Sequence, residues 1–160
     1  MATYEYGNMW DIKEHTDLFL ITTNSYIKKN GAVVMGKGIA KTVKDKYPGI
    51  DKVFGELINS KAGHLGKYGM FVNPLWPQNN LGIFQVKFHF RYSASMNLIK
   101  YSIKKLLEFN DYHYKSNFRI DMNFPGIGNG RLSIRDVKPI LDILPDNIHI
   151  WTFNKIALDK

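Results

Sequence analysis

The amino-acid sequence predicts an α/β protein of three layers, in which helices cover both faces of a central mixed, mostly parallel sheet. The first observation is that apolar segments of strand length alternate along the chain with segments of helical periodicity. The second is the segment 17–24, DLFLITTN, whose continuous apolar core is typical of a strand covered on both faces. We therefore expect a buried central strand here, running out into a loop at its Thr and Asn end.

The remaining elements are expected in order along the chain. The first helix begins at Gly36 and ends where Pro48-Gly49 interrupts the apolar spacing. The most regular helical face lies further on, between Met96 and Leu107. The other expectations are a helix over 52–60, adjacent strands over 67–74 and 81–88, an N-cap at Ser93 or Ser95, a strand over 117–124, a helix over 133–144 with Pro139 as an irregularity, and a strand over 147–153.

Size and composition limit the protein class. A chain of 160 residues with 44% hydrophobic residues buries one sizeable core, so residues 1–160 are expected to form a single domain. The formal charge of +8 favours anionic partners, either nucleic acid or phosphate-bearing small molecules. The chain has no cysteine, which excludes disulfides and thiolate chemistry. With no signal-peptide pattern and no apolar stretch of about 20 residues, we expect a soluble, cytoplasmic protein with no membrane partner.

Two glycine-rich loops follow expected strands. Residues 31–38, GAVVMGKG, come after the strand that ends near Asn24, and residues 125–132, PGIGNGRL, come after the strand that ends near Phe124. In α/β sheets a ligand binds beyond the carboxyl ends of the strands. The paired loops therefore suggest a ligand site, although each loop alone is equally consistent with tight turns that serve only the fold.

The first loop is not a P-loop. Its pattern matches G-x-x-x-x-G-K, but Gly38 stands where a Ser or Thr hydroxyl would ligand Mg²⁺. Six residues, SYIKKN, also separate Asn24 from Gly31, whereas a P-loop turns directly from its strand. The loop instead leads to a helix N-terminus, where unpaired N–H groups attract an anion, and the second loop offers a facing set of donors. Two facing loops suit a diphosphate.

Three segments resemble the macrodomains, a family that binds ADP-ribose and related metabolites. The segments are ITTNSYIKKNGAVVMGKGIAKTVKDKYPGI, FQVKFHFRYSASMNLIKYSIKKL and FPGIGNGRLSIRDVKPIL, in this order. They are most similar to the bacterial and phage-type branch, which includes glycohydrolases that remove ADP-ribose from DNA or from protein carboxylates. The resemblance covers most of the chain and implies a macrodomain-like α/β/α fold.

The resemblance also implies roles for particular residues. Asn8 stands where the family usually has an aspartate that accepts the adenine amino group, and its amide oxygen accepts that bond without the charge. Asn24 would reach the distal ribose. Phe153 would border the adenine, or would belong to the core instead. The implied ligand-binding residues are Asn8, Asn24, Met35, Gly36, Lys37, Gly38, Gly126, Ile127, Gly128, Asn129, Gly130, Arg131, Phe153 and Asn154.

Lys87 matches the position of a lysine that attacks the opened distal ribose in the glycohydrolase branch. Such an amine must be unprotonated, so its ordinary pKa of about 10.4 has to be lowered by desolvation or by nearby cations. A solvated lysine at a strand end is the alternative. His89 is the second catalytic candidate. No pair among the five histidines shows metal-ligand spacing with a carboxylate or cysteine partner, so no metal and no cofactor are expected.

The second loop favours binding over turnover. Protein-deglycosylating relatives carry an acidic residue shortly after their second glycine, and GNGRLS has none. We therefore expect a protein that binds ADP-ribose or an ADP-ribosylated substrate, with hydrolysis of ADP-ribose 1''-phosphate or of an ADP-ribosyl linkage left open. The alternative is a basic nucleic-acid-binding module without ADP-ribose chemistry, because Lys and Arg neutralise phosphates and exposed aromatic rings stack on bases.

Overall fold

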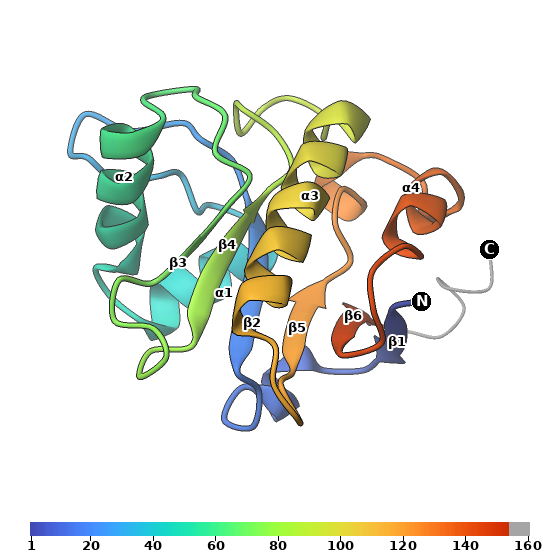
Figure 1. Ribbon diagram of the computed structural model, residues 1–160. Helices are drawn as coiled ribbons and strands as arrows, with labels where there is room; N and C mark the ends of the chain where they lie inside the picture. The colour runs from blue at the N-terminus through green and yellow to red at the C-terminus, as the bar shows by residue number, and fades with distance from the viewer. Residues whose placement is uncertain (154–160) are drawn as a thin grey trace.

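The computed structural model describes residues 1–153, and Figure 1 shows their arrangement. Six strands and four α-helices, with two short 3-10 helices, make up this part of the chain. The elements are β1 (Thr3–Tyr6), η1 (Met9–Ile12), β2 (Leu18–Thr23), α1 (Gly38–Lys46), α2 (Ile50–Lys61), β3 (Met70–Val72), β4 (Leu81–Gln85), α3 (Met96–His113), β5 (Ile120–Asn123), η2 (Gly128–Gly130), α4 (Ile134–Leu141) and β6 (Ile148–Thr152).

The six strands form one sheet in the order β1-β6-β5-β2-β4-β3. Every neighbouring pair is parallel except β3 and β4, which are antiparallel. The expectation of a mixed, mostly parallel sheet is therefore confirmed. β2 lies at its centre, with Phe19 opposite Leu81 of β4 and Leu18 opposite Ile120 of β5.

Alternate residues of β2 reach two separate cores, which gives the molecule its three layers. Leu18 and Leu20 pack on the face that α3 and α4 cover, whereas Phe19 and Ile21 pack on the face that α1 and α2 cover. All four side chains have no exposed surface. A strand with apolar residues at every position is required here, because both of its faces are covered (Figure 1).

The structure adds one strand to the expected elements and decides between the two expected caps. The N-terminal strand β1 was not expected, because it is a short, half-exposed strand at the edge of the described sheet, where it pairs with β6. The helix α3 is longer than the apolar pattern between Met96 and Leu107, and Ser95 rather than Ser93 caps it, accepting a hydrogen bond from the N–H of Leu98 at 3.2 Å. Within residues 1–153, none of the helices has the length and apolar composition that crossing a bilayer requires.

The connections leave the central strands in opposite directions. After β2 the chain passes to α1 on one face, whereas after β4 and β5 it passes to α3 and α4 on the other. β2 lies between β4 and β5 in the sheet. Loops that diverge from neighbouring parallel strands leave a crevice beyond their carboxyl ends, which is where ligands bind in open α/β sheets.

Candidate functional site

The two glycine-rich loops lie side by side at the carboxyl edge of the sheet. One follows β2 and leads into α1, and the other follows β5 and leads into α4. A Cβ atom placed on Gly38 would lie 3.5 Å from Nδ2 of Asn129. The start of α1 is thus within van der Waals distance of the second loop, although the two segments are far apart in the sequence.

The first loop is held open by a small hairpin. The N–H of Val34 donates to the carbonyl of Tyr26 at 3.1 Å, next to an isolated bridge between Ile27 and Val33. Asn24 stabilises this hairpin from inside: its side-chain oxygen accepts the N–H of Tyr26 at 2.9 Å, and its side-chain nitrogen donates to Val34 at 3.0 Å. The side-chain oxygen and the side-chain nitrogen of the buried Asn24 are therefore both hydrogen-bonded to the segment 26–34, which leads into the first glycine-rich loop.

The end of the first loop is exposed, in contrast to the residue before it. Met35 is 2% exposed and packs in the core beneath α1, so only its backbone faces the loop surface. Gly36, Lys37 and Gly38 are exposed. Lys37 is the N-cap of α1 and has extended backbone, but its side chain makes no capping hydrogen bond. The first turn of α1 thus has N–H groups without a side-chain partner, the usual feature of a helix N-terminus that binds an anion.

The second loop is anchored to the start of α3. The N–H of Ala94 donates to the carbonyl of Gly130 at 2.8 Å. Gly126 and Gly130 are buried, and a Cβ on Gly126 would lie 2.8 Å from Cδ1 of Ile99. Gly126 also has φ +83°, so its backbone conformation favours glycine, and a Cβ on Gly130 would lie 3.0 Å from that of Ala94.

The exposed part of the second loop is the segment Gly128–Asn129. Gly130 and Arg131 already donate their N–H groups within the loop, to the carbonyls of Ile127 at 3.2 Å and Gly128 at 3.0 Å. Within residues 1–153, the N–H groups of Gly128 and Asn129 make no backbone hydrogen bond. They are the donors that this loop offers to a ligand.

Lys87 lies just after β4 and contacts the second loop. Its Nζ donates to the carbonyls of Tyr92 at 3.2 Å, Phe90 at 3.3 Å and Asn129 at 3.5 Å. The pKa of its amine is lowered, chiefly by partial burial and further by the positive charges of Arg131 and Lys37. Lysines with a lowered pKa are the ones that act as nucleophiles, so Lys87 has the electrostatic environment that such chemistry needs.

His89 belongs to a cluster of rings beside Lys87. Its ring centroid lies 4.6 Å from that of Phe90, 4.9 Å from that of Tyr92 and 4.8 Å from that of Tyr26. Its Nδ1 accepts the N–H of Arg91 at 3.0 Å. His89 was expected from the sequence, but the aromatic cluster around it was not. The many aromatic residues of KFHFRY could have indicated this cluster.

Comparison with solved structures identifies the fold. The macrodomain of Thermus aquaticus DarG matches with a TM-score of 0.68 and 21% identity, over 96% of this chain and 98% of that chain. The macrodomain of Mycobacterium tuberculosis DarG matches with a TM-score of 0.69 and 21% identity, over 96% and 99%. This chain has the macrodomain fold. The structure of Thermosipho africanus DarTG in complex with ADP-ribose matches 95% of this chain and 43% of that chain, with a TM-score of 0.68 and 20% identity. No protein-family model matches the chain, and no curated protein matches it in sequence.

The macrodomain fold places the residues expected near adenine beyond the paired strands β1 and β6. Asn8 follows β1, and its side-chain oxygen accepts the N–H of Trp10 at 3.0 Å as the N-cap of η1. Phe153 follows β6 and is 90% exposed, so the interpretation of Phe153 as a core residue is wrong. Asn154 lies outside the described residues. Because Tyr6 and Thr152 are register partners, Asn8 and Phe153 are on the same edge of the sheet.

Gln85 is a structural residue of this macrodomain fold that sequence analysis missed. It has no exposed surface, and its side-chain oxygen accepts the N–H groups of Tyr68 at 2.8 Å and Gly69 at 3.1 Å. Its side-chain nitrogen donates to Ser25 Oγ at 3.1 Å and to Gly66 at 2.9 Å. Gln85 therefore connects the loop after β2 with the end of β4 by hydrogen bonds, two residues before Lys87.

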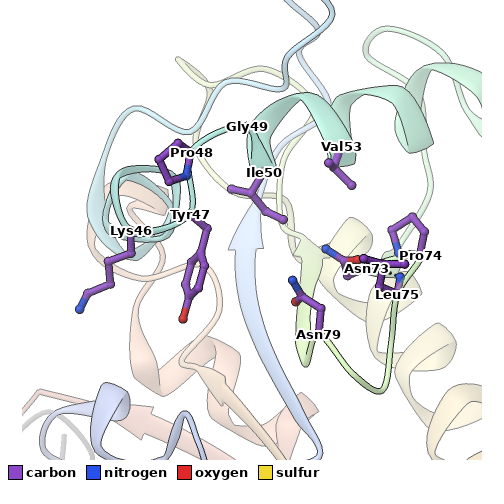
Figure 2. Close-up of a pocket in the computed structure, with 10 residues that line it drawn as sticks. All are labelled: Lys46, Tyr47, Pro48, Gly49, Ile50, Val53, Asn73, Pro74, Leu75 and Asn79. Carbon is purple, nitrogen blue, oxygen red and sulfur yellow. Dashed lines mark hydrogen bonds between the residues drawn. The ribbon is translucent and has the colours of Figure 1, made fainter.

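A separate shallow groove lies at the opposite, amino-terminal edge of the sheet, between α1, α2 and the loop that joins β3 to β4 (Figure 2). It has a volume of about 640 Å³ and is lined by Lys46, Tyr47, Pro48, Gly49, Ile50, Val53, Asn73, Pro74, Leu75 and Asn79. The side-chain oxygens of Asn73 and Asn79 accept the N–H groups of Leu75 and Leu81 within their own turns. Two of the polar side chains of the groove are thus used within their own turns, and the site at the carboxyl edge remains the functional candidate.

Proposed function

We propose that this protein binds ADP-ribose or an ADP-ribose derivative at the carboxyl edge of its sheet, with the diphosphate between the two glycine-rich loops. The observation that carries the proposal is the approach of Gly38 to Asn129, with the Lys87 amine bonded to the same Asn129. This arrangement supports a pocket in which the N-terminus of α1 faces the N–H groups of Gly128 and Asn129.

Charge supports an anionic ligand at this position. Lys37 and Arg131 are close enough to Lys87 to lower the pKa of its amine, so three positive side chains gather at the mouth of the two loops. Repulsion among them is relieved when an anion binds, and a diphosphate supplies the charge that balances them. The formal charge of +8 on the whole chain adds long-range attraction.

The order of the strands supports a direction for the ligand. The sheet runs β6-β5-β2-β4, so the residues after β6 and the Lys87 amine after β4 stand on either side of the two loops. Three strand intervals span about 14 Å, enough for two sugars joined by a diphosphate. We therefore assign the adenine end to Asn8 and Phe153 and the distal ribose to Lys87.

Lys87 is the proposed nucleophile toward the distal ribose. The nitrogen of its neutral amine bonds to the anomeric carbon as the group linked there leaves with the bonding electron pair, and one amine proton passes to that leaving group. The ring C–O bond then breaks, the second amine proton passes to the ring oxygen, and an imine remains between the nitrogen and the carbon. Water then hydrolyses the imine, which restores the amine and releases the ribose as its aldehyde. ADP-ribose 1''-phosphate and an ADP-ribosyl linkage both present this carbon, so the same step serves either substrate.

The binding experiment uses Gly36, which is exposed and whose Cβ would meet only Val34 Cγ1, at 3.9 Å. Calorimetry with ADP-ribose should give micromolar affinity for the parent protein, near 8 kcal/mol of binding free energy. The G36W variant should fold normally and lose roughly tenfold or more in affinity, about 1.4 kcal/mol, because the indole occupies the ligand space. G36A is the matched control. No detectable heat with millimolar ADP-ribose would overturn the proposal.

The chemical experiment traps the imine. Free ADP-ribose carries an anomeric carbon that opens to an aldehyde, so borohydride reduction should couple it to Lys87, and peptide mass spectrometry locates the adduct. The K87R variant should give no adduct at residue 87, while K37R should still be modified at Lys87. Adducts spread over surface lysines without preference for Lys87 would exclude the nucleophile role and leave the binding proposal intact.

The alternative, a nucleic-acid-binding module, is based on the charge of +8. It predicts tight binding of a single-stranded oligonucleotide at physiological salt, with an affinity that falls steeply as salt rises. If the oligonucleotide binds in this way and ADP-ribose neither binds nor competes, the alternative replaces the ADP-ribose proposal.

A further inference from the structure

The Lys87 amine is held mainly by a turn of its own loop. Two of its three carbonyl acceptors are Phe90 at 3.3 Å and Tyr92 at 3.2 Å. These carbonyls lie in the segment 89–92, which is closed by the N–H of Tyr92 donating to the carbonyl of His89 at 3.0 Å. The direction in which the amine points therefore depends on the shape of this turn.

The His89 side chain closes the same turn a second time. Its Nδ1 accepts the N–H of Arg91, two residues on, at 3.0 Å. This is the hydrogen bond that an Asn or Asp side chain makes in an Asx-turn. An imidazole nitrogen accepts a hydrogen bond only when it carries no proton, so the ring is neutral in this arrangement, with its proton on Nε2.

The ring of His89 is fixed in place by its neighbours. Phe90 and Tyr92 of its own loop stack against it, and Tyr26 of the loop after β2 contacts it edge-on. A second histidine, His64, also contacts the Tyr26 ring edge-on, and its Nδ1 accepts the N–H of Ile27 at 3.0 Å. The imidazole of His89 is thus held by contacts within its own loop and with Tyr26.

We propose that His89 is a positioning residue, whose neutral imidazole shapes the 89–92 turn and so aims the Lys87 amine. The inference rests on the proposed function, because the amine has a task only if Lys87 attacks the distal ribose. Protonation of His89 places two donors face to face at Nδ1 and opens the turn. The titratable and charged groups around the ring are Tyr26, Lys87, Arg91 and Tyr92, with His64 beyond Tyr26.

Two substitutions separate the acceptor from the ring. H89N keeps an oxygen that accepts the Arg91 N–H as an Asx-turn and does not titrate, whereas H89F keeps the aromatic stack and has no acceptor. Borohydride trapping of ADP-ribose at Lys87 should proceed in H89N within about twofold of the parent rate and in H89F roughly tenfold more slowly, with ADP-ribose affinity little changed in both.

The pH profile gives the sharper result. On acidification, the trapping rate of the parent protein, measured with acid-stable cyanoborohydride, should fall with a steeper slope than that of H89N, because a proton on Nδ1 removes the His89 acceptor and the Asn oxygen does not titrate. Equal slopes in the parent and H89N, or equal rates in the parent and H89F, would overturn the positioning role while trapping at Lys87 still supports the proposed function.

A measurement without ligand separates the two proposals. Hydrogen exchange of the Arg91 amide, relative to its intrinsic rate, should be slow in H89N at every pH, slower in the parent at neutral than at acidic pH, and fast in H89F. If this pattern appears while no ADP-ribose binds, the turn is as described and the proposed function fails. If Arg91 exchanges equally in all three proteins, the His89 inference fails by itself.

Discussion

Alanine at three glycines of the two loops should separate the glycines that serve the fold from those that face the ligand. Gly126 has φ +83°, and its Cβ would lie 2.8 Å from Cδ1 of Ile99 and 3.0 Å from Cδ1 of Leu132. Gly128 has φ +64° but open space around it, and Gly36 has an ordinary φ with only an ordinary contact. Alanine at Gly126 thus meets both a strained backbone and a close contact, alanine at Gly128 meets only the strained backbone, and alanine at Gly36 meets neither.

The magnitudes follow from these penalties. A left-handed conformation costs a non-glycine residue roughly 1–2 kcal/mol. Overpacking at Gly126 adds about 1 kcal/mol, the low end of its usual range, because the atoms met are the terminal methyl groups of Ile99 and Leu132. We therefore expect losses of unfolding free energy of about 2–3 kcal/mol for G126A, about 1–2 kcal/mol for G128A and less than about 0.5 kcal/mol for G36A. Urea denaturation followed by circular dichroism measures all three, provided that the slope with denaturant stays constant. A loss in G36A as large as that in G126A would refute the reasoning.

Three further predictions concern single contacts. The D121A variant should lose about 3 kcal/mol of unfolding free energy, measured by urea denaturation. The Asp121 carboxylate has no exposed surface and accepts hydrogen bonds from Arg119 at 2.8 and 2.9 Å and from Trp151 at 2.7 Å. A loss no larger than that of K41A, which breaks an exposed ion pair, would contradict this prediction. S95A should lose about 1 kcal/mol by removing the α3 cap, and S95D should retain it. The pKa of Lys87 is lowered in the folded protein, so between that pKa and about 10.4 the unfolded chain binds more protons than the folded one. The unfolding free energy of the parent, relative to that of K87M, should therefore rise with pH in this window. A difference in unfolding free energy that does not change with pH would be inconsistent with the lowered pKa.

The sequence predicts the layers well because β2 carries apolar residues on both faces. Leu18 to Ile21 could not be solvated on either side, so a central strand was the only reasonable interpretation. β1 carries no such signal: its four residues are half-buried or exposed, and they form a strand only because β6 lies beside them. Edge strands are set by their partner more than by their own pattern.

The site is predictable in outline and not in its contacts. Loops that follow parallel strands must meet at one edge of the sheet, so the proximity of Gly38 and Asn129 follows from the order of elements. The acceptors of the Lys87 amine are backbone carbonyls. Every residue has a backbone carbonyl, so the residue types do not reveal which ones accept these bonds. Met35 shows the opposite difficulty, because a side chain in a proposed ligand loop packs in the core.

The pairing of β1 with β6 joins Glu5 to His149, residues separated by 144 positions. An edge of this kind closes only after almost the whole sheet exists, because the partner strand is synthesised last and the chain entropy lost in closing so long a loop must first be offset elsewhere. During synthesis, the adenine end of the proposed pocket is therefore the last part to form. A nascent chain with its centre already folded would hold both glycine-rich loops and still lack the surface proposed to hold the adenine.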